Sequence, residues 1–267
     1  MAVSIGKCRL CLLDHQELQE SHFIPAGIYG ITRDAEASNP NPLLISPEMY
    51  VQTSRQVKDY LFCGDCERLL NDNGEQWMIS QCFRSAEGRF PLRERLQGVD
   101  PFLSGKGSLG FNTANIRGIE HGKIIYYAMS VYWRAAIHWW RIGRQTITPI
   151  NLGQYEEKIR RFLRKEEQLD SNVYLSVWLS GREIPNVISS VPTSHCVEGA
   201  GIMHRMNIPG IAFVLTIGRK VNDGVKQTCL IHVPGRPMFV SFHVDDELIS
   251  NLISTVKTSR GAKERKE

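Results

Sequence analysis

Two Cys-x-x-Cys pairs constrain the fold of this chain more than any other feature of its sequence. The first pair is Cys8 and Cys11, and the second is Cys63 and Cys66. Two thiolates two residues apart can bind one metal ion from a single tight turn, and two such pairs complete a tetrahedral site of four sulfurs, which suits zinc. The alternative is four unrelated buried cysteines. We expect a structural zinc ion that organises residues 1–80, because a closed site leaves no coordination position for chemistry.

The other cysteines and the apolar segments bear on the cellular compartment. Cys82, Cys196 and Cys229 are scattered, and an odd total of seven without a signal sequence argues against a disulfide framework. The most apolar stretch, 124–140, contains Arg134 and His138, and it is too short and polar to span a bilayer. We therefore expect a cytoplasmic protein without a membrane partner. The oligomeric state is unknown from the sequence.

Composition and charge allow several functions. The chain has 267 residues, a hydrophobic fraction of 42% and a net charge of +4, which is normal for a globular protein and compatible with a polyanionic partner. Candidate phosphate contacts are Arg84, Arg89, Arg93, Arg95 and a basic tail at 257–267. A second basic cluster at 158–165 is flanked by glutamates, so we interpret it as a solvated helix face.

Periodicity predicts an α+β protein. Apolar spacing and capping residues predict helices over 69–81, 123–143, 152–168 and 245–257. Segments rich in β-branched and aromatic residues predict strands near 108–111 and over 173–179, 210–217, 228–233 and 238–244, with a turn at 222–224. We expect a zinc-binding module over 1–80, a helical plus antiparallel β domain of unknown role over 81–256, and a disordered basic tail over 257–267.

The segment between the cysteine pairs is 51 residues long and contains Ser21-His22-Phe23-Ile24-Pro25. Glu67 follows the second pair directly, and Asn71 follows one helical turn later. This order, a Cys pair, then His-x-Ile-Pro, then Leu-x-Cys-x-x-Cys at a helix start, resembles the zinc-containing branch of the HNH endonuclease family. The resemblance covers residues 8–75 and implies a zinc-held ββα-metal module.

The resemblance implies a site as well as a fold. His22 matches the family histidine that activates the attacking water. Glu67 falls where the family usually has a metal-binding histidine or asparagine, and Asn71 lies one helical turn later on the same face. A carboxylate at Glu67 suits Mg²⁺, which prefers hard oxygen ligands. The implied function is a metal-dependent endonuclease that acts on DNA, in bacterial defence or mobile-element biology.

The sequence also departs from the family pattern. Ser21 occupies the position of an acid or second histidine that holds the metal, and segment 56–59 lacks the usual asparagine, although Asp59 is present. His22 would then brace the hairpin through a backbone carbonyl, and Glu67 would stabilise a helix start. The alternative function is a non-catalytic zinc-binding module that binds nucleic acid or a protein partner. A third alternative is that the C-terminal part senses a ligand and controls the first module.

Overall fold

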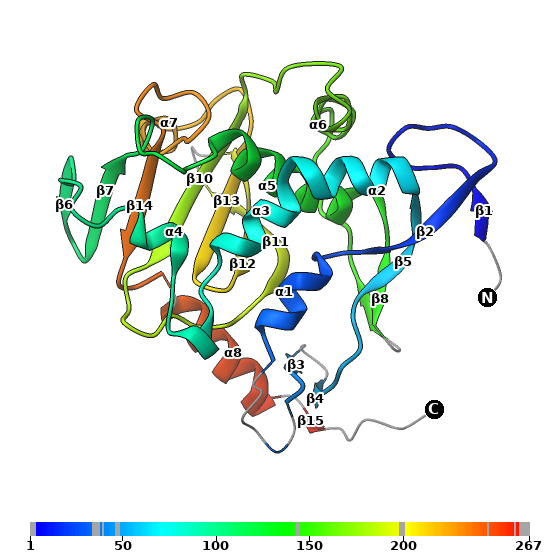
Figure 1. Cartoon of the computed structure of the whole chain (residues 1–267), viewed down its shortest axis with the longest axis horizontal. Coiled ribbons are helices and arrows are strands. Elements are labelled where there is room, and N and C mark those ends of the chain that lie inside the picture. The colour runs from blue at the N-terminus through cyan, green and yellow to red at the C-terminus, as the bar shows by residue number, and fades with distance from the viewer. Residues whose placement is uncertain are drawn as a thin grey trace.

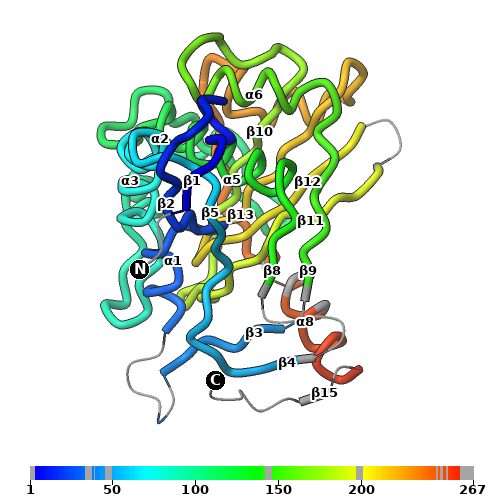
Figure 2. Tube along the Cα trace, turned by 90° about the vertical axis from the view of Figure 1, so that its right-hand side faces the viewer, coloured from blue at the N-terminus to red at the C-terminus, as the bar shows by residue number. Residues whose placement is uncertain are grey.

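The computed structural model describes residues 4–33, 38, 40–45, 49–142, 145–197, 201–244, 246–258 and 260–261. The protein is a mixture of helices and sheets, which confirms the α+β class (Figure 1). The central helix α5 (His121–Ile137) lies between a group of N-terminal elements and a large sheet (Figure 2).

The large sheet has seven strands in the order β11-β12-β13-β10-β14-β7-β6. All neighbours are antiparallel except β10 and β14, which are parallel. Side chains alternate between its faces, so Val173, Leu175 and Val177 of β10 point into the core and are buried. The strands are β6 (Leu103–Gly105), β7 (Ser108–Asn112), β10 (Val173–Ser180), β11 (Ser190–Val197), β12 (Gly201–Ile208), β13 (Ile211–Ile217) and β14 (Pro237–Ser241).

Helix α5 is held against this sheet by aromatic side chains. The Tyr127 ring lies 5.9 Å from that of Phe213 on β13. The Tyr132 hydroxyl lies 3.0 Å from the carbonyl oxygen of His204 on β12 and 2.9 Å from that of Phe213. Twelve residues of α5 are buried, among them Tyr126, Tyr127, Tyr132 and Trp133, so the aromatic residues of this helix are core packing.

The N-terminal elements form a three-stranded antiparallel sheet with helices attached. Its strands are β1 (Ser4–Gly6), β2 (Gln16–His22) and β5 (Lys58–Cys63), in the order β1-β2-β5. Helix α1 (Ala26–Ile31) follows β2, and after β5 the chain continues through α2 (Gly64–Leu70), a π-helical turn (Asn71–Glu75) and α3 (Gln76–Gln81). The module therefore contains two antiparallel strands, β2 and β5, the second of which leads directly into a helix.

Glycine lets the π-helical turn approach α5. A Cβ atom at Gly74 would lie 2.8 Å from the backbone nitrogen of Tyr127, so a side chain would force the two helices apart. This close approach brings the N-terminal helices and α5 into one packed layer.

Smaller elements complete the fold. The sheet β15-β4-β3 lies below the large sheet near α8 in both views (Figures 1 and 2). The smaller elements of the fold are β3 (Leu43–Ile45), β4 (Met49–Gln52), α4 (Pro91–Glu94), β8 (Trp140–Ile142), β9 (Gln145–Ile147), α6 (Tyr155–Leu163), α7 (Asp223–Gln227), α8 (Asp246–Thr258) and β15 (Arg260–Gly261).

Several predicted elements differ from the structure. The long helix ends at Ile137, because His138 is extended and strand β8 follows; a stop at residue 143 lies outside the described residues. The predicted turn at 222–224 is the start of α7, where the Asn222 side chain accepts a hydrogen bond from the Val225 N–H. The predicted strand at 228–233 is wrong: these residues form turns after α7.

One buried cluster connects the chain. It includes Cys8, Phe62 and Leu70 from the first eighty residues, and Tyr127 and Phe213 from later elements. The division at residue 80 remains a prediction, and side chains from both sides of it share this core. Most of the predicted basic tail lies outside the described residues.

Candidate metal centre and histidine site

The four cysteines of the two pairs lie together. Their sulfur atoms are all within 4.8 Å of one another, and those of Cys11 and Cys63 are 3.9 Å apart. Four sulfurs about 2.3 Å from one tetrahedral ion would be about 3.8 Å apart. Cys8, Cys63 and Cys66 are buried and Cys11 is partly buried. The group could therefore hold a metal ion such as zinc.

Local backbone geometry places the first pair. The Leu12 N–H donates to the Cys8 carbonyl across 2.9 Å, and Leu12 has a positive φ of 63°, which turns the chain sharply after Cys11. The second pair joins the end of β5 to α2. The Cys63 N–H points at the Cys8 sulfur across 3.4 Å. The hydrogen bond between the Cys8 and Cys66 side chains lowers the pKa of the Cys8 thiol and raises that of Cys66, so Cys8 is the member of this pair that more readily becomes a thiolate.

Two arginines approach this group, Arg160 of α6 and Arg164 at the C-cap of that helix. Arg160 donates to the Leu10 carbonyl across 2.7 Å, and Arg164 lies 4.0 Å from the Cys66 sulfur. Their charge opposes the negative charge that four thiolates would carry around a divalent ion. The prediction of a solvated helix face holds for Lys158, Arg161 and Lys165, which are exposed, and is wrong for Arg160, which is buried. Ile159 and Leu163 of the same helix are buried, and this apolar face indicates that the helix packs against the core.

His22 is the last residue of β2 and is half-buried. Its carbonyl accepts a hydrogen bond of 2.7 Å from Arg134 Nη1, and its ring lies 6.5 Å from that of Tyr29. Burial lowers the pKa of the imidazole, as does the positive charge of Lys58, its cross-strand partner. The negative charge of Glu67 opposes this shift. His22 is therefore neutral near pH 7.

Glu67 lies in α2 with one carboxylate oxygen sealed from solvent. Among the described residues, no group donates a hydrogen bond to its Oε1. Its negative charge acts on both His22 and Arg134, and for Arg134 it opposes the burial that lowers the guanidinium pKa to about 10. Buried polar atoms normally have a hydrogen-bonding partner, so this oxygen is a candidate position for a water or a cation.

The other positions named from the motif have different surroundings. Asn71 is exposed, and its amide donates to Asp72 across 3.2 Å. Ser21 is buried and points to the opposite side of β2 from His22; its hydroxyl oxygen accepts a hydrogen bond from the Phe62 N–H across 3.3 Å. Asp59 lies 2.8 Å from His138 Nε2.

Glu20 lies close enough to His22 to act on its charge. Its negative charge acts on the His22 imidazole, and its carboxylate forms an ion pair of 2.6 Å with Lys58. Residues two apart on a strand share a face, which puts Glu20 and His22 on the same side of β2.

A buried ion pair missed by sequence analysis lies behind this site. Arg134, on α5, is paired with Glu75 of the π-helical turn, and both are at least nine-tenths buried. Arg134 also donates to the carbonyls of His22 and Phe23. On α5, Arg134 is offset from the helix face that carries Tyr126, Met129 and Trp133. Its partners are distant in sequence, so the sequence does not predict this ion pair.

The candidate phosphate-binding arginines already have partners within the protein. Arg84 pairs with Glu87 at 3.0 Å and Arg89 with Glu94 at 2.9 Å. Arg93 donates to the Ser180 carbonyl. Arg95 donates to the Gln81 side chain. These contacts reduce the charge that the segment presents to a polyanion.

No helix among the described residues has the length and apolar character needed to cross a bilayer. Comparisons of the chain with protein-family models, with curated proteins and with solved structures give no significant match.

Proposed function

We propose that this protein is a metal-dependent endonuclease that cleaves DNA at a site formed by His22 and Glu67. In this proposal a structural zinc ion at Cys8, Cys11, Cys63 and Cys66 fixes β5 and α2, and Glu67 binds a catalytic Mg²⁺. The resemblance of residues 8–75 to zinc-containing HNH endonucleases supports the proposal. So does the order of two antiparallel strands and a helix around the four cysteines.

The observation that carries the proposal is the pairing of a neutral imidazole with an unsatisfied carboxylate. His22 is half-buried with a lowered pKa, and the nearby Glu67 has a buried oxygen without a donor. Buried carboxylate oxygens normally have partners, and oxygen ligands suit Mg²⁺. A basic nitrogen beside a metal-binding oxygen is the combination that phosphodiester hydrolysis requires.

In the proposed reaction, water attacks phosphorus while its proton passes to the ring nitrogen of His22. The P–O bond to the leaving oxygen breaks, and a Mg²⁺ held by Glu67 would supply positive charge to offset the negative charge on that oxygen. General-base catalysis by a positioned histidine typically contributes about a hundred- to ten-thousand-fold.

Cleavage of plasmid and linear DNA in Mg²⁺, Mn²⁺ and Ni²⁺ tests the proposal. His22→Ala should lower the rate at least about a hundredfold, and Glu67→Gln should raise the metal concentration required. Matched controls are His195→Ala and Glu156→Gln, which change exposed residues on other elements. An active wild type that His22→Ala leaves unchanged would overturn the assignment.

A second candidate is a non-catalytic zinc module that binds nucleic acid or a protein partner. It is favoured by the cations already present: Arg134 supplies positive charge near Glu67, and Lys58 neutralises Glu20. Inert wild type that binds DNA, with an affinity that falls steeply with salt, would favour this candidate. If DNA binding is absent at low salt as well, a protein partner becomes the better hypothesis.

A further inference from the structure

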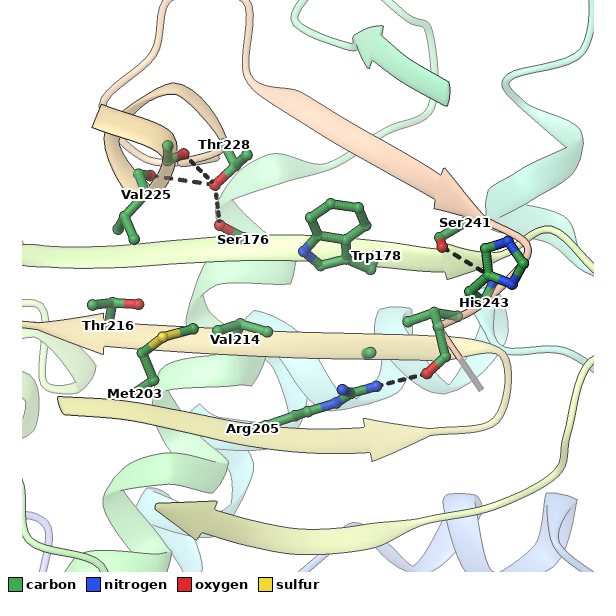
Figure 3. Close-up of a pocket in the computed structure, with 13 residues that line it drawn as sticks. Ser176, Trp178, Met203, Arg205, Val214, Thr216, Val225, Thr228, Ser241 and His243 are labelled. Carbon is green, nitrogen blue, oxygen red and sulfur yellow. Dashed lines mark hydrogen bonds between the residues drawn. The ribbon is translucent and has the colours of Figure 1, made fainter. Parts of the chain in front are cut away.

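The face of the seven-stranded sheet that points away from α5 bears a cavity of about 440 Å³ (Figure 3). Its floor comes from outward-facing residues of three adjacent strands, because the alternate residues of these strands face the core. Neither His22 nor any of the four paired cysteines lines it, so a ligand here would be independent of the proposed nuclease site. The lining from these strands is Ser176 and Trp178 on β10, Met203 and Arg205 on β12, and Ala212, Val214 and Thr216 on β13.

The floor of the cavity is mainly apolar and carries an aromatic ring of fixed orientation. The Trp178 indole stacks on the Phe239 ring with centroids 4.7 Å apart and an angle of 27° between the planes. Met203 and Val214 continue the apolar surface beside it (Figure 3). Such a surface suits a flat apolar group, since aromatic rings prefer offset stacking or edge contacts.

At one end of the cavity the hydrogen bonds leave an acceptor. The Thr228 hydroxyl donates to the main-chain carbonyls of Gly224 and Val225, at 3.0 and 3.3 Å, and its oxygen lies 2.9 Å from that of Ser176. A hydroxyl has one proton and two lone pairs. Because the Thr228 proton goes to a carbonyl, Ser176 donates its own proton to Thr228, and the Ser176 oxygen keeps its capacity to accept.

A second hydroxyl at this end has no partner in the protein. Thr216 is 2% exposed and lines the cavity from β13, at a position diagonal to Ser176 on the neighbouring strand (Figure 3). No group among the described residues forms a hydrogen bond with its side chain, whereas buried hydroxyls normally have a partner. A ligand hydroxyl would satisfy both positions, because it can donate to Ser176 and accept from Thr216.

The charged groups at the opposite end are already bonded within the protein. Arg205 Nη2 donates to the Val244 carbonyl across 2.7 Å (Figure 3). His243 Nδ1 lies 3.0 Å from the Asp246 carboxylate, which also pairs with Arg182. None of the described lining residues is acidic. A charged ligand would therefore lose hydration without gaining an unpaired counter-charge, and this favours a neutral one.

We propose that this cavity binds a small neutral aromatic alcohol, with its ring system on the apolar floor and its hydroxyl group between Ser176 and Thr216. The volume lies within the range of about 300–1,000 Å³ that is usual for small-molecule sites. A phenolic hydroxyl, with a pKa of about 10, is uncharged near neutral pH. It therefore meets the hydrogen-bonding requirement of one end without placing a charge at the other.

Fluorescence anisotropy of naphthalene probes, titrated with the full chain near pH 7 and excited beyond the tryptophan band, tests this proposal. The probes are 2-naphthol, its methyl ether 2-methoxynaphthalene, which lacks the proton, and naphthalene-2-carboxylate, which is charged. One hydrogen bond typically changes affinity by about two- to tenfold. We expect 2-naphthol to bind at least threefold more tightly than the ether and at least tenfold more tightly than the carboxylate.

Two hydroxyl variants separate the two ends of the ligand's hydrogen bonding. Ser176→Ala removes the acceptor, so it should bring the preference for 2-naphthol over the ether below twofold while the affinity for the ether changes less than threefold. Thr216→Val keeps the shape of the side chain and should weaken both probes by a similar factor, because both carry the oxygen that accepts from Thr216. Thr146→Val, at an exposed strand position outside the cavity, is the matched control and should have no effect.

Steric variants test the location. Val214→Trp adds bulk on the floor and should weaken 2-naphthol at least tenfold, whereas Ile184→Trp, at an exposed position outside the cavity, should have no effect. Thr216→Val removes a hydroxyl that has no protein partner, so it remains informative if Ser176→Ala or Val214→Trp does not fold. Equal affinity for 2-naphthol and the ether, tighter binding of the carboxylate, unchanged binding to Thr216→Val, or no rise in anisotropy with 2-naphthol would each overturn the proposal.

Discussion

Arg134 on α5 donates a hydrogen bond of 2.7 Å to the main-chain carbonyl of His22, at the end of β2. The same guanidinium pairs with Glu75 in the π-helical turn that follows α2. One side chain therefore connects the strand that carries His22 with the helical segment that follows Glu67. Because all three elements are packed in one core, this contact fixes the spacing of the candidate site.

Replacing this arginine should be costly to stability. Arg134→Met leaves the Glu75 carboxylate buried without its cation, and breaking a buried pair in this way costs about 3–5 kcal/mol. The double variant that combines Arg134→Met with Glu75→Gln should recover part of that loss, since it removes the unpaired charge. Urea unfolding measures both variants, with Arg141→Met at an exposed position as control. A loss below about 1 kcal/mol for Arg134→Met would contradict this account.

The cysteine group should make folding depend on metal. Gently purified protein should contain about one zinc per chain, and chelation or Cys63→Ser should destabilise it. Cys63 and Cys66 belong to the common core, so metal loss should destabilise the whole protein. A decrease of about 4 kcal/mol in the free energy of unfolding should lower the Tm of a chain of this size by about 8–16 °C. Cys196→Ser, which changes an exposed cysteine, is the control. Elemental analysis that finds no zinc, or a Tm that does not change when chelator is added, would contradict the prediction of a structural metal ion.

Arg164 should tune the affinity of that metal. Its guanidinium lies 4.0 Å from the Cys66 sulfur, and removing a group of this kind around a metal site typically costs about ten- to a hundredfold in affinity. We expect Arg164→Ala to release zinc to a chromogenic chelator at a correspondingly lower chelator concentration. Arg161→Ala, on the same helix and paired with Glu167 at 2.5 Å, should behave as wild type. Equal release from both variants would mean that Arg164 does not act on the metal.

The sequence was most informative where the signal is local. Both cysteine pairs, and the motif that contains His22, are spacings within a few residues, and the strands over 173–180 and 211–217 follow from short runs of apolar residues. Strands β11 and β12 were missed because they contain histidines, a proline and polar residues. Pairing with β13 and burial of one face, which no local pattern encodes, stabilise them.

Long-range contacts explain the rest of what was missed. Arg134 is 112 residues from His22, and Arg160 is 150 residues from Leu10, so no spacing rule connects them. Similarly, Ser176, Met203 and Val214 line one cavity from three strands that are adjacent only in the folded sheet. Each strand on its own gives no sign of a site.

Acid should destabilise the protein through His204. This side chain is fully buried on β12, its Nδ1 lies 2.8 Å from the Ser194 hydroxyl, and burial lowers its pKa from 6.5 to about 4. The unfolded chain therefore binds a proton more tightly than the folded one, so stability is full above about pH 6.5 and falls as the pH drops toward 4. At 1.36 kcal/mol per pKa unit, the difference between 6.5 and about 4 corresponds to about 3 kcal/mol.

Urea unfolding between pH 7.5 and pH 4 measures this loss. His22 and His121 also have lowered pKa values and contribute to the acid sensitivity of every variant, so the comparison with His204→Gln isolates one residue. His204→Gln should start less stable at pH 7.5, because it disturbs a packed site, but should lose about 3 kcal/mol less on acidification. His15→Gln, which changes an exposed histidine near the N-terminus, should follow the wild-type curve. Parallel curves for His204→Gln and the wild type would show that His204 remains uncharged in the unfolded chain or charged in the folded one, contrary to its burial.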